Sequence, residues 1–187
     1  MSWKDVALAH AKEQEPKESC GLLINIKAKA EDTGKILAVI HSHPTTQPIA
    51  SQADMISCED SKLPWHIVNP QTEQWGYYEP SGYKPPLIGR HWVWGVTDCW
   101  ALVRDWYKEK KGITLRDWER PITPEEFIAD PMFERCAWRT GFRQLRPEEK
   151  LENGDLLFMS ILTTGLNHVA IFIDGDVLHH LADRISC

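Results

Sequence analysis

The spacing of apolar residues predicts an alternation of helix and strand in the first part of the chain. Val6, Ala7 and Ala11 recur at helical intervals near the N-terminus, which indicates one amphipathic helix. The runs CGLLINI and KILAVIHS are rich in leucine and β-branched residues and are typical of strands. Two further short strands are expected at 65–68 and 75–78, because the turn residues NPQTEQ separate them.

A different pattern follows, with one helix ahead of three strands. TDCWALVRDWYKEKKG has apolar residues at helical spacing, with Thr97 or Asp98 as the N-cap and Gly112 as the end. The segment 113–146 is predicted to be irregular apart from a helix start at TPEEF. NGDLLFMS, NHVAIFI and DVLHHL are strand signals, and the residues DGD predict a tight hairpin between the last two.

Proline and glycine gather in EPSGYKPPLIGRH, which predicts a boundary between two small domains near residues 84–90. We expect these domains to cover 1–84 and 89–187. With 187 residues, of which 42% are apolar, the chain is long enough to build real cores. The second domain, one helix followed by an antiparallel sheet, indicates the α+β class.

Charge and cysteine usage limit the partners and the compartment. The formal net charge is -6 and the longest basic run is KEKKG, whereas nucleic-acid surfaces need clustered Lys and Arg. Five cysteines without a C-x-x-C pair are expected to stay reduced. No apolar run approaches the ~20 residues of a membrane span, and the N-terminus lacks the pattern of a secretory signal. We therefore expect synthesis in a cytoplasm without export by the usual route.

The stretch HSHPTTQPIASQAD, residues 41–54, holds candidate metal ligands. His41 and His43 lie two positions apart at the end of a predicted strand, so their side chains project from the same face. Asp54 follows in a segment that can begin a helix. Two imidazoles and one carboxylate leave the fourth position of a zinc ion open for water, as catalytic zinc requires. Glu18, just before CGLLINI, is then the candidate general base.

A polar loop that contains histidine without binding metal is the alternative interpretation of HSHP. The spacing favours the metal site, because seven residues separate His43 from Ser51 and two separate Ser51 from Asp54. With the upstream glutamate, this set resembles the JAMM signature of the MPN (Mov34, PAD-1) metalloprotease family, which implies a small α/β domain. The resemblance assigns Zn2+ to His41, His43 and Asp54, the base to Glu18, and stabilisation of the oxyanion to Ser51.

The path from Glu18 to His41 is short, with 22 intervening residues. Proteins with the JAMM signature usually place a longer segment, including a strand and a helix, at this point. The domain is therefore expected to be shortened, and a shortened path can displace Glu18 from the metal. A site that binds zinc without catalysing a reaction is the alternative outcome.

The second domain offers an independent set of reactive groups. Cys99 opens the predicted helix, where free N–H groups and the helix dipole are expected to lower the pKa of its thiol. His168 opens the strand HVAIFI, and the partner strand carries His179 and His180, so a second histidine can lie beside the first. A thiol, a base and a group that orients the base form the Cys-His catalytic arrangement. A small buried core residue is the alternative role for Cys99.

The segments TDCWALVRDWY, NGDLLFMS and NHVAIFIDGDVLHHL, in this order, resemble the NlpC/P60 family of papain-like cysteine peptidases, which cut the peptide stems of bacterial cell wall. The resemblance runs from about residue 89 to residue 181 and implies that Cys99 is the nucleophile and His168 the general base. The local pattern of two apolar residues followed by histidine selects His179 as the orienting residue, whereas a count of twelve residues from His168 selects His180. His179 is narrowly preferred, because successive side chains on a strand face opposite ways.

The remaining cysteines and the tryptophans near Cys99 have structural interpretations. No chemistry is assigned to Cys20, Cys58, Cys136 and Cys187. The tryptophans near Cys99 can line a glycan or peptide groove, and core positions are the alternative; they are Trp92, Trp94, Trp100 and Trp106.

A JAMM-type domain followed directly by an NlpC/P60 domain resembles the K family of tail-tip assembly proteins of lambda-type phages. The resemblance implies that other tail-tip proteins are partners, with assembly in the host cytoplasm and a final place at the virion tail tip. It also implies local opening of peptidoglycan during genome entry. A catalytically silent component of the tail tip is the alternative.

Overall fold

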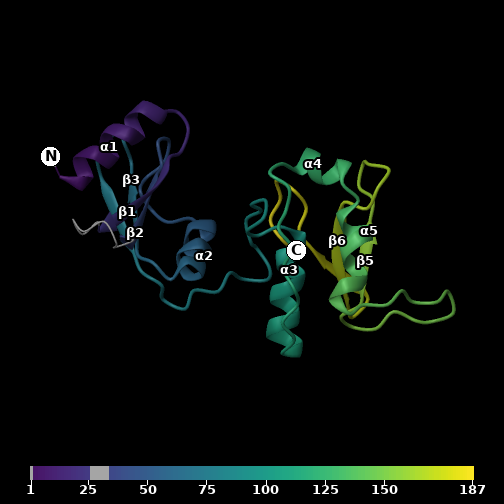
Figure 1. Cartoon of the computed structure of the whole chain (residues 1–187). Helices are drawn as coiled ribbons and strands as arrows, with labels where there is room; N and C mark the ends of the chain where they lie inside the picture. Colours follow the sequence, from purple (N-terminus) through teal and green to yellow (C-terminus); the bar gives the residue numbers. More distant parts are fainter. Residues whose placement is uncertain (1, 26–33) are drawn as a thin grey trace. The chain divides into compact units, whose positions relative to one another are not determined.

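A computed structural model describes residues 2–25 and 34–187 of the chain. Contacts divide the chain into two compact units, Met1–Lys84 and Pro85–Cys187, and each unit is described by itself (Figure 1). The segment 26–33, which includes the last residue of the predicted strand CGLLINI, lies outside the described residues.

The first unit contains one mixed sheet and two helices. Its strands follow the order β1-β2-β3-β4, in which β2 and β3 are parallel and the outer pairs are antiparallel. The helix α2 connects the two parallel strands, so the central part of the unit is a β-α-β crossover. The elements are α1 (Trp3–Gln14), β1 (Cys20–Asn25), β2 (Lys35–Ser42), α2 (Gln52–Ser61), β3 (Trp65–Val68) and β4 (Trp75–Tyr78).

Helix α1 begins at a capping box and packs against the sheet. The side chain of Ser2 accepts a hydrogen bond from the backbone N–H of Asp5, and the Asp5 carboxylate accepts one from the N–H of Ser2. The ring of Trp3 contacts the rings of His66 and Trp75, with centroids 4.9 and 5.6 Å away. Aromatic contacts therefore attach α1 to β3 and β4, and Figure 1 shows the helix beside the sheet.

The second unit is built on α3 (Cys99–Trp106), which continues as the π-helical turn η1 (Tyr107–Lys111) and ends at Gly112. The side chain of Asp98 is the N-cap and accepts a hydrogen bond from the backbone N–H of Ala101. Gly112 has a φ of 68°, the left-handed conformation that commonly ends a helix. The predicted helix and both of its ends are confirmed.

The sheet of the second unit has the order β5-β6-β7 and is antiparallel. Its strands are β5 (Leu156–Met159), β6 (His168–Ile173) and β7 (Asp176–His179). Asp174 and Gly175 connect β6 to β7 with φ values of 51° and 97°, as expected for a type I′ turn with a matching hairpin twist. Residues of α3 and β6 lie in one buried core cluster, which includes Leu102, Val103, Val169 and Ile171.

The connection between α3 and the sheet contains more structure than the sequence predicts. Helix α4 (Pro124–Ala129) begins within TPEEF, as predicted, and Thr123 forms a capping box there. In contrast, α5 (Met132–Cys136) and the short 3-10 helix η2 (Ala137–Thr140) fall in the segment predicted to be irregular. Helix α5 has no side-chain cap and buries Met132, Phe133 and Cys136 in the core. Tertiary packing therefore stabilises a helix that has too little local signal to be predicted.

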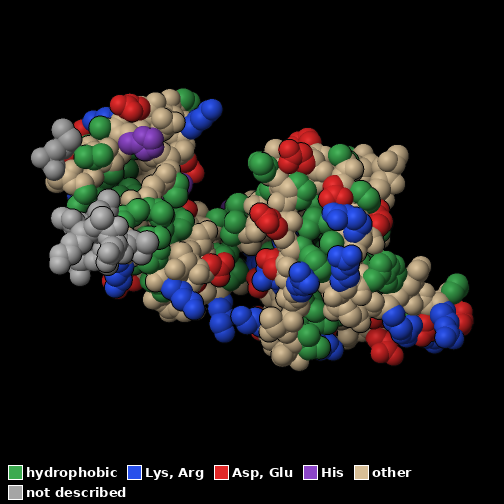
Figure 2. Space-filling model, in the orientation of Figure 1, with side chains coloured by type: hydrophobic (Ala, Val, Ile, Leu, Met, Phe, Trp, Pro, Cys, Tyr) green, Lys and Arg blue, Asp and Glu red, His purple; other side chains and the backbone are tan. Residues whose placement is uncertain are grey.

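The surface has mixed charge on the face that Figure 2 presents. Basic and acidic side chains are interspersed over the second unit in this view. Ion pairs on that unit include Arg143 with Glu149 and Arg135 with Asp130. Within the described residues, no helix combines the length and apolar character needed to cross a membrane.

Replacing Leu102 by alanine is expected to destabilise the second unit by about 2–5 kcal/mol, because truncation of a buried leucine leaves a cavity. Leu102 is 1% exposed, whereas Ile122 is 88% exposed, so Ile122→Ala is the matched control and should change the free energy of unfolding by less than about 0.5 kcal/mol. Urea unfolding of the full chain, followed by circular dichroism, measures both. Equal midpoints for the two variants would contradict this description of the core.

Candidate functional sites

The candidate metal ligands of the first unit converge on one point. The Nε2 atom of His41 lies 3.4 Å from a carboxylate oxygen of Glu18 and 3.6 Å from Oδ1 of Asp54. The Nε2 atom of His43 lies 3.2 Å from Oδ2 of Asp54. The structure therefore brings together all three predicted ligands and the predicted base, although they come from three separate elements. Among the described residues, the group with spacing suited to a metal ion consists of Glu18, His41 and His43, so it contains the predicted base and does not include Asp54.

Strand pairing explains why Glu18 reaches this point despite the short path. Cys20 pairs with His41 in the antiparallel β1–β2 ladder, so the residues before β1 run beside the end of β2. The hydroxyl of Ser42 accepts a hydrogen bond of 2.7 Å from the backbone N–H of Ser19 and fixes this arrangement. The side chain of Glu18 consequently lies beside His41.

The second nitrogen of each histidine is held by a backbone carbonyl. Nδ1 of His41 lies 3.1 Å from the oxygen of Ser19, and Nδ1 of His43 lies 3.2 Å from the oxygen of Gln47. A carbonyl can only accept, so each Nδ1 carries the proton in the neutral ring and each Nε2 presents a lone pair. In that state the Nε2 lone pairs and the facing carboxylate oxygens can share a cation. The arrangement fits a divalent ion such as zinc, with the outer hydrogen bonds that orient histidine ligands.

Ser51, to which the resemblance assigns the oxyanion, also has a structural role. It is the N-cap of α2, where its hydroxyl accepts a hydrogen bond of 3.2 Å from the backbone N–H of Asp54. In return, the N–H of Ser51 donates to Oδ2 of Asp54 at 2.7 Å. The capping box therefore orients the Asp54 carboxylate towards both histidines. The S-x-x-D spacing in SQAD carried this signal.

The candidate nucleophile of the second unit, Cys99, is the first residue of α3 and is 9% exposed. Backbone N–H groups of Val169 and Trp100 donate hydrogen bonds to its sulfur. Val169 follows His168 in β6, so the thiol lies at the end of the strand that carries the candidate base. Among the hydrogen bonds of the described residues, none joins Cys99 directly to His168.

The expectation of a lowered pKa at Cys99 is wrong. Burial, and secondarily the negative charge of Asp98, raise the pKa of the Cys99 thiol to about 12. The hydrogen bonds from Val169 and Trp100 and the charge of Arg120 act in the opposite direction. Desolvation of a thiolate in this buried position outweighs the stabilisation that a helix N-terminus provides.

His168 is 4% exposed, and burial lowers the pKa of its imidazole to about 4, with smaller contributions from His179 and His180. At neutral pH both the thiol and the imidazole are therefore uncharged in this structure. A neutral imidazole can accept a proton, as a general base must. Activation of the thiol then requires transfer of its proton during the attack, because the pair does not start as thiolate and imidazolium.

The hairpin register separates the two candidates for the orienting residue. His179 pairs with Ala170 in the β6–β7 ladder, which puts its side chain on the same face as His168, and Nδ1 of His179 lies 3.3 Å from Nε2 of His168. His180 projects from the opposite face, is fully buried, and has its Nε2 3.0 Å from the carbonyl oxygen of Arg184. The structure thus places His179 beside the candidate base and His180 against the C-terminal segment.

A pocket rich in aromatic side chains adjoins Cys99. Trp94 and Trp100, two of the tryptophans singled out from the sequence, line it. Trp100 also belongs to the core cluster, as does Trp106, which does not line the pocket. Trp118 also lines the pocket, and the sequence offered no signal for it because it lies in an irregular segment. Polar groups reach the pocket from Asp98, Arg120 and Asn167. The other lining residues are Phe127, Met132, Phe133, Cys136, Ala137, Thr140 and Phe158.

Comparison with known proteins assigns the second unit to a protein family. Residues 89–187 match the NlpC/P60 family, so the second unit is an NlpC/P60 domain. No solved structure matches the chain significantly.

The relatives extend the assignment to nearly the whole chain. It is 32% identical to the tail tip assembly protein K of Escherichia phage N15 over 213 positions, which cover 97% of this chain and 85% of the relative. It is 33% identical to the tail tip assembly protein K of Escherichia phage lambda over 171 positions, which cover 84% and 76%. The chain therefore belongs to the tail tip assembly protein K family and carries an NlpC/P60 domain, as the sequence predicted.

Acidification between pH 6.5 and 4 is expected to destabilise the second unit. An unfolded histidine titrates near pH 6.5, whereas burial lowers the pKa of folded His168 to about 4 and also lowers that of His180. In this window the unfolded chain binds more protons, so stability falls as pH falls. His168→Gln should reduce the loss by on the order of 2 kcal/mol, measured by urea unfolding at pH 7 and pH 4.5.

The exposed His10 of α1 gives the control for this experiment. His10→Gln should leave the acid-induced loss of stability unchanged. A loss of the same size in wild type and His168→Gln would contradict the assignment of His168 as a buried, neutral group.

Proposed function

We propose that the second unit is a cysteine peptidase that cleaves peptide stems of peptidoglycan, and that it acts from the phage tail tip during genome entry. The observation that supports this most strongly is the contact between His179 and His168, in which Nδ1 of His179 lies 3.3 Å from Nε2 of His168, with Cys99 near Val169, the next residue of β6. Membership in the NlpC/P60 family supports the proposed chemistry, and membership in the tail tip assembly protein family supports the proposed location. Other tail-tip proteins are the partners, and assembly takes place in the host cytoplasm.

In the proposed reaction, the Cys99 sulfur attacks the carbonyl carbon of the scissile amide while His168 accepts the thiol proton. His179 holds the imidazole of His168 by its Nε2, which leaves Nδ1 of His168 to act as the base. His168 then gives the proton to the leaving amine, and a thioester to Cys99 remains. Water, deprotonated by His168, hydrolyses the thioester, releases a carboxylic acid and restores the thiol.

Wild-type protein incubated with purified peptidoglycan under reducing conditions is expected to release stem peptides, and Cys99→Ala is expected to abolish release. His179→Ala should lower the rate by about 10- to 100-fold, because the base loses the contact that orients it. Mass spectrometry of the soluble products measures release. Cys187→Ser, which changes an exposed cysteine, is the matched control and should behave as wild type.

Absence of release by folded wild-type protein would reject the peptidase proposal. It would favour the alternative, in which the chain is a silent assembly component of the tail tip.

We also propose that the first unit is an MPN-like domain with a zinc site, held by His41, His43 and Asp54, that cleaves a protein during tail assembly. Support comes from the donor set itself, in which two Nε2 lone pairs face a carboxylate at 3.2 to 3.6 Å. When bound, zinc supplies Lewis acidity. Glu18 is placed beside His41 to accept a proton from water, and the hydroxyl of Ser51 keeps a proton to donate towards a developing oxyanion.

The purified full chain is expected to bind about one zinc ion, and His43→Ala is expected to lose it, because a ligand with a fixed imidazole cannot be replaced by a methyl group. Elemental analysis after dialysis measures the metal content. Glu18→Gln should keep the zinc while losing protease activity, which separates binding from catalysis. His10→Ala is the control histidine, and retention of zinc by His43→Ala would overturn the ligand assignment.

A further inference from the structure

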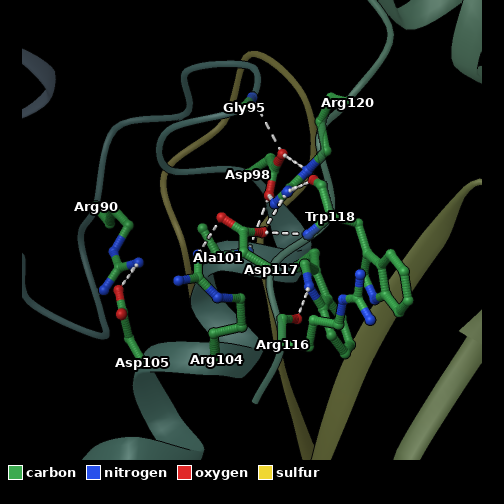
Figure 3. A network of polar contacts seen from close by, with 11 residues as sticks. Arg90, Gly95, Asp98, Ala101, Arg104, Asp105, Arg116, Asp117, Trp118 and Arg120 are labelled. Atoms are coloured by element: carbon green, nitrogen blue, oxygen red, sulfur yellow. Dashed lines mark hydrogen bonds and ion pairs between the residues drawn. The ribbon is translucent and has the colours of Figure 1, made fainter. Parts of the chain in front are cut away.

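The residue immediately before the candidate nucleophile is a buried carboxylate with a specific cationic partner. Asp98 is 2% exposed, caps α3 through Ala101, and also accepts a hydrogen bond of 3.1 Å from the backbone N–H of Gly95. Arg120 donates to both of its oxygens, from Nε at 2.9 Å and from Nη2 at 3.0 Å. Figure 3 shows this bidentate contact at the centre of a polar network.

Arg120 reaches Asp98 from an irregular segment that is itself clamped onto α3. Its guanidinium also contacts the Asp117 carboxylate and the carbonyl oxygen of Trp118, and Asp117 pairs with Arg104 of α3 at 2.7 Å. The charges thus alternate along α3 in the order Asp98, Arg120, Asp117, Arg104 (Figure 3). The side chain of Arg120 is 7% exposed, so solvent screens its interaction with Asp98 only weakly.

An unpaired carboxylate in this position would oppose the chemistry of Cys99. The negative charge of Asp98 disfavours a thiolate on the next residue, whereas the positive charge of Arg120 favours it. Both Asp98 and Arg120 line the same pocket as Cys99. The guanidinium therefore offsets the penalty that the helix cap imposes on the nucleophile.

We propose that Arg120 is a positioning residue for the peptidase site, which keeps Cys99 reactive by neutralising the buried carboxylate of Asp98 through a bidentate ion pair. The role rests on the proposed function of Cys99 as a nucleophile. The interaction also holds the segment that carries Trp118 against the pocket. Arg120 therefore affects both the charge and the shape of the site.

Each element that packs around Cys99 contributes a titratable or charged group. On α3 the group is Asp98, and on the irregular segment it is Arg120. On β6 it is His168, with His179 of β7 behind it. Cys136 of α5 lines the same pocket. Arg120 is the only cation among the groups that shift the pKa of Cys99 in the described part of the chain.

The test measures the rate at which iodoacetamide alkylates Cys99 in the full chain between pH 6 and 10, by mass spectrometry of the peptide that contains it. The exposed Cys187 serves as an internal reference for reagent reactivity. Arg120→Gln is expected to slow alkylation of Cys99 by about tenfold or more at pH 8 and to move the pH profile to higher pH. Arg120→Lys keeps the charge without the fork and should give an intermediate rate.

Two further variants separate charge from structure. Asp98→Asn retains a good N-cap and should accelerate alkylation. Unfolding would also accelerate it by exposing Cys99, so the slower alkylation expected of Arg120→Gln is the effect that misfolding cannot imitate. The double variant Asp98→Asn with Arg120→Gln should return to within about threefold of wild type, because both charges are gone. Arg104→Gln removes the ion pair to Asp117 but leaves Asp98 and Arg120 paired, and is the matched control with an unchanged profile.

The proposal is overturned if Arg120→Gln has the pH profile of wild type, or if the double variant is as slow as Arg120→Gln. A near-ultraviolet spectrum confirms folding of each variant. Because alkylation needs no substrate, this outcome is independent of peptidoglycan release. A negative result here and a negative result in the peptidase assay are thus distinguishable.

Discussion

The pairing of β6 with its two neighbours is the interaction on which the second unit depends. A two-residue turn at Asp174 and Gly175 sets the register with β7 and puts His179 on the same face as His168. A shift of one residue would move His180 into that place. The same strand packs against α3 and directs the N–H of Val169 to the sulfur of Cys99. Strand register and helix packing together therefore define the relative positions of the three side chains.

Much of this arrangement follows from local sequence signals. The Asp-Gly turn, the Asp98 cap, the Gly112 end and the alternation in HVAIFI lie within a few residues of what they determine. The clustering of His41, His43 and Asp54 was predictable for the same reason, since strand alternation and a capping box orient side chains locally. The position of Glu18 was not, because it depends on the β1–β2 pairing across a segment that the sequence suggested was too short.

Other features required contacts that the sequence does not reveal. Helix α5 exists because its residues fill the core, and the ion pair of Arg120 with Asp98 joins positions 22 residues apart through an irregular segment. The pKa of Cys99 was predicted in the wrong direction for a related reason. A helix N-terminus is visible in the sequence, whereas the burial that outweighs it is a property of the folded unit.

The ion pair of Asp98 and Arg120 is not explained by stability alone. Burying two charges costs free energy that their attraction only partly returns, and apolar replacements of similar volume are often as stable. A neutral N-cap such as asparagine would start α3 nearly as well. Under the proposed role, the ion pair is explained by its effect on Cys99. Asp98 holds the first turn of α3, and with it Cys99, by hydrogen bonds to Gly95 and Ala101. Arg120 permits this rigid carboxylate to stand beside a thiol that must become negative during the reaction.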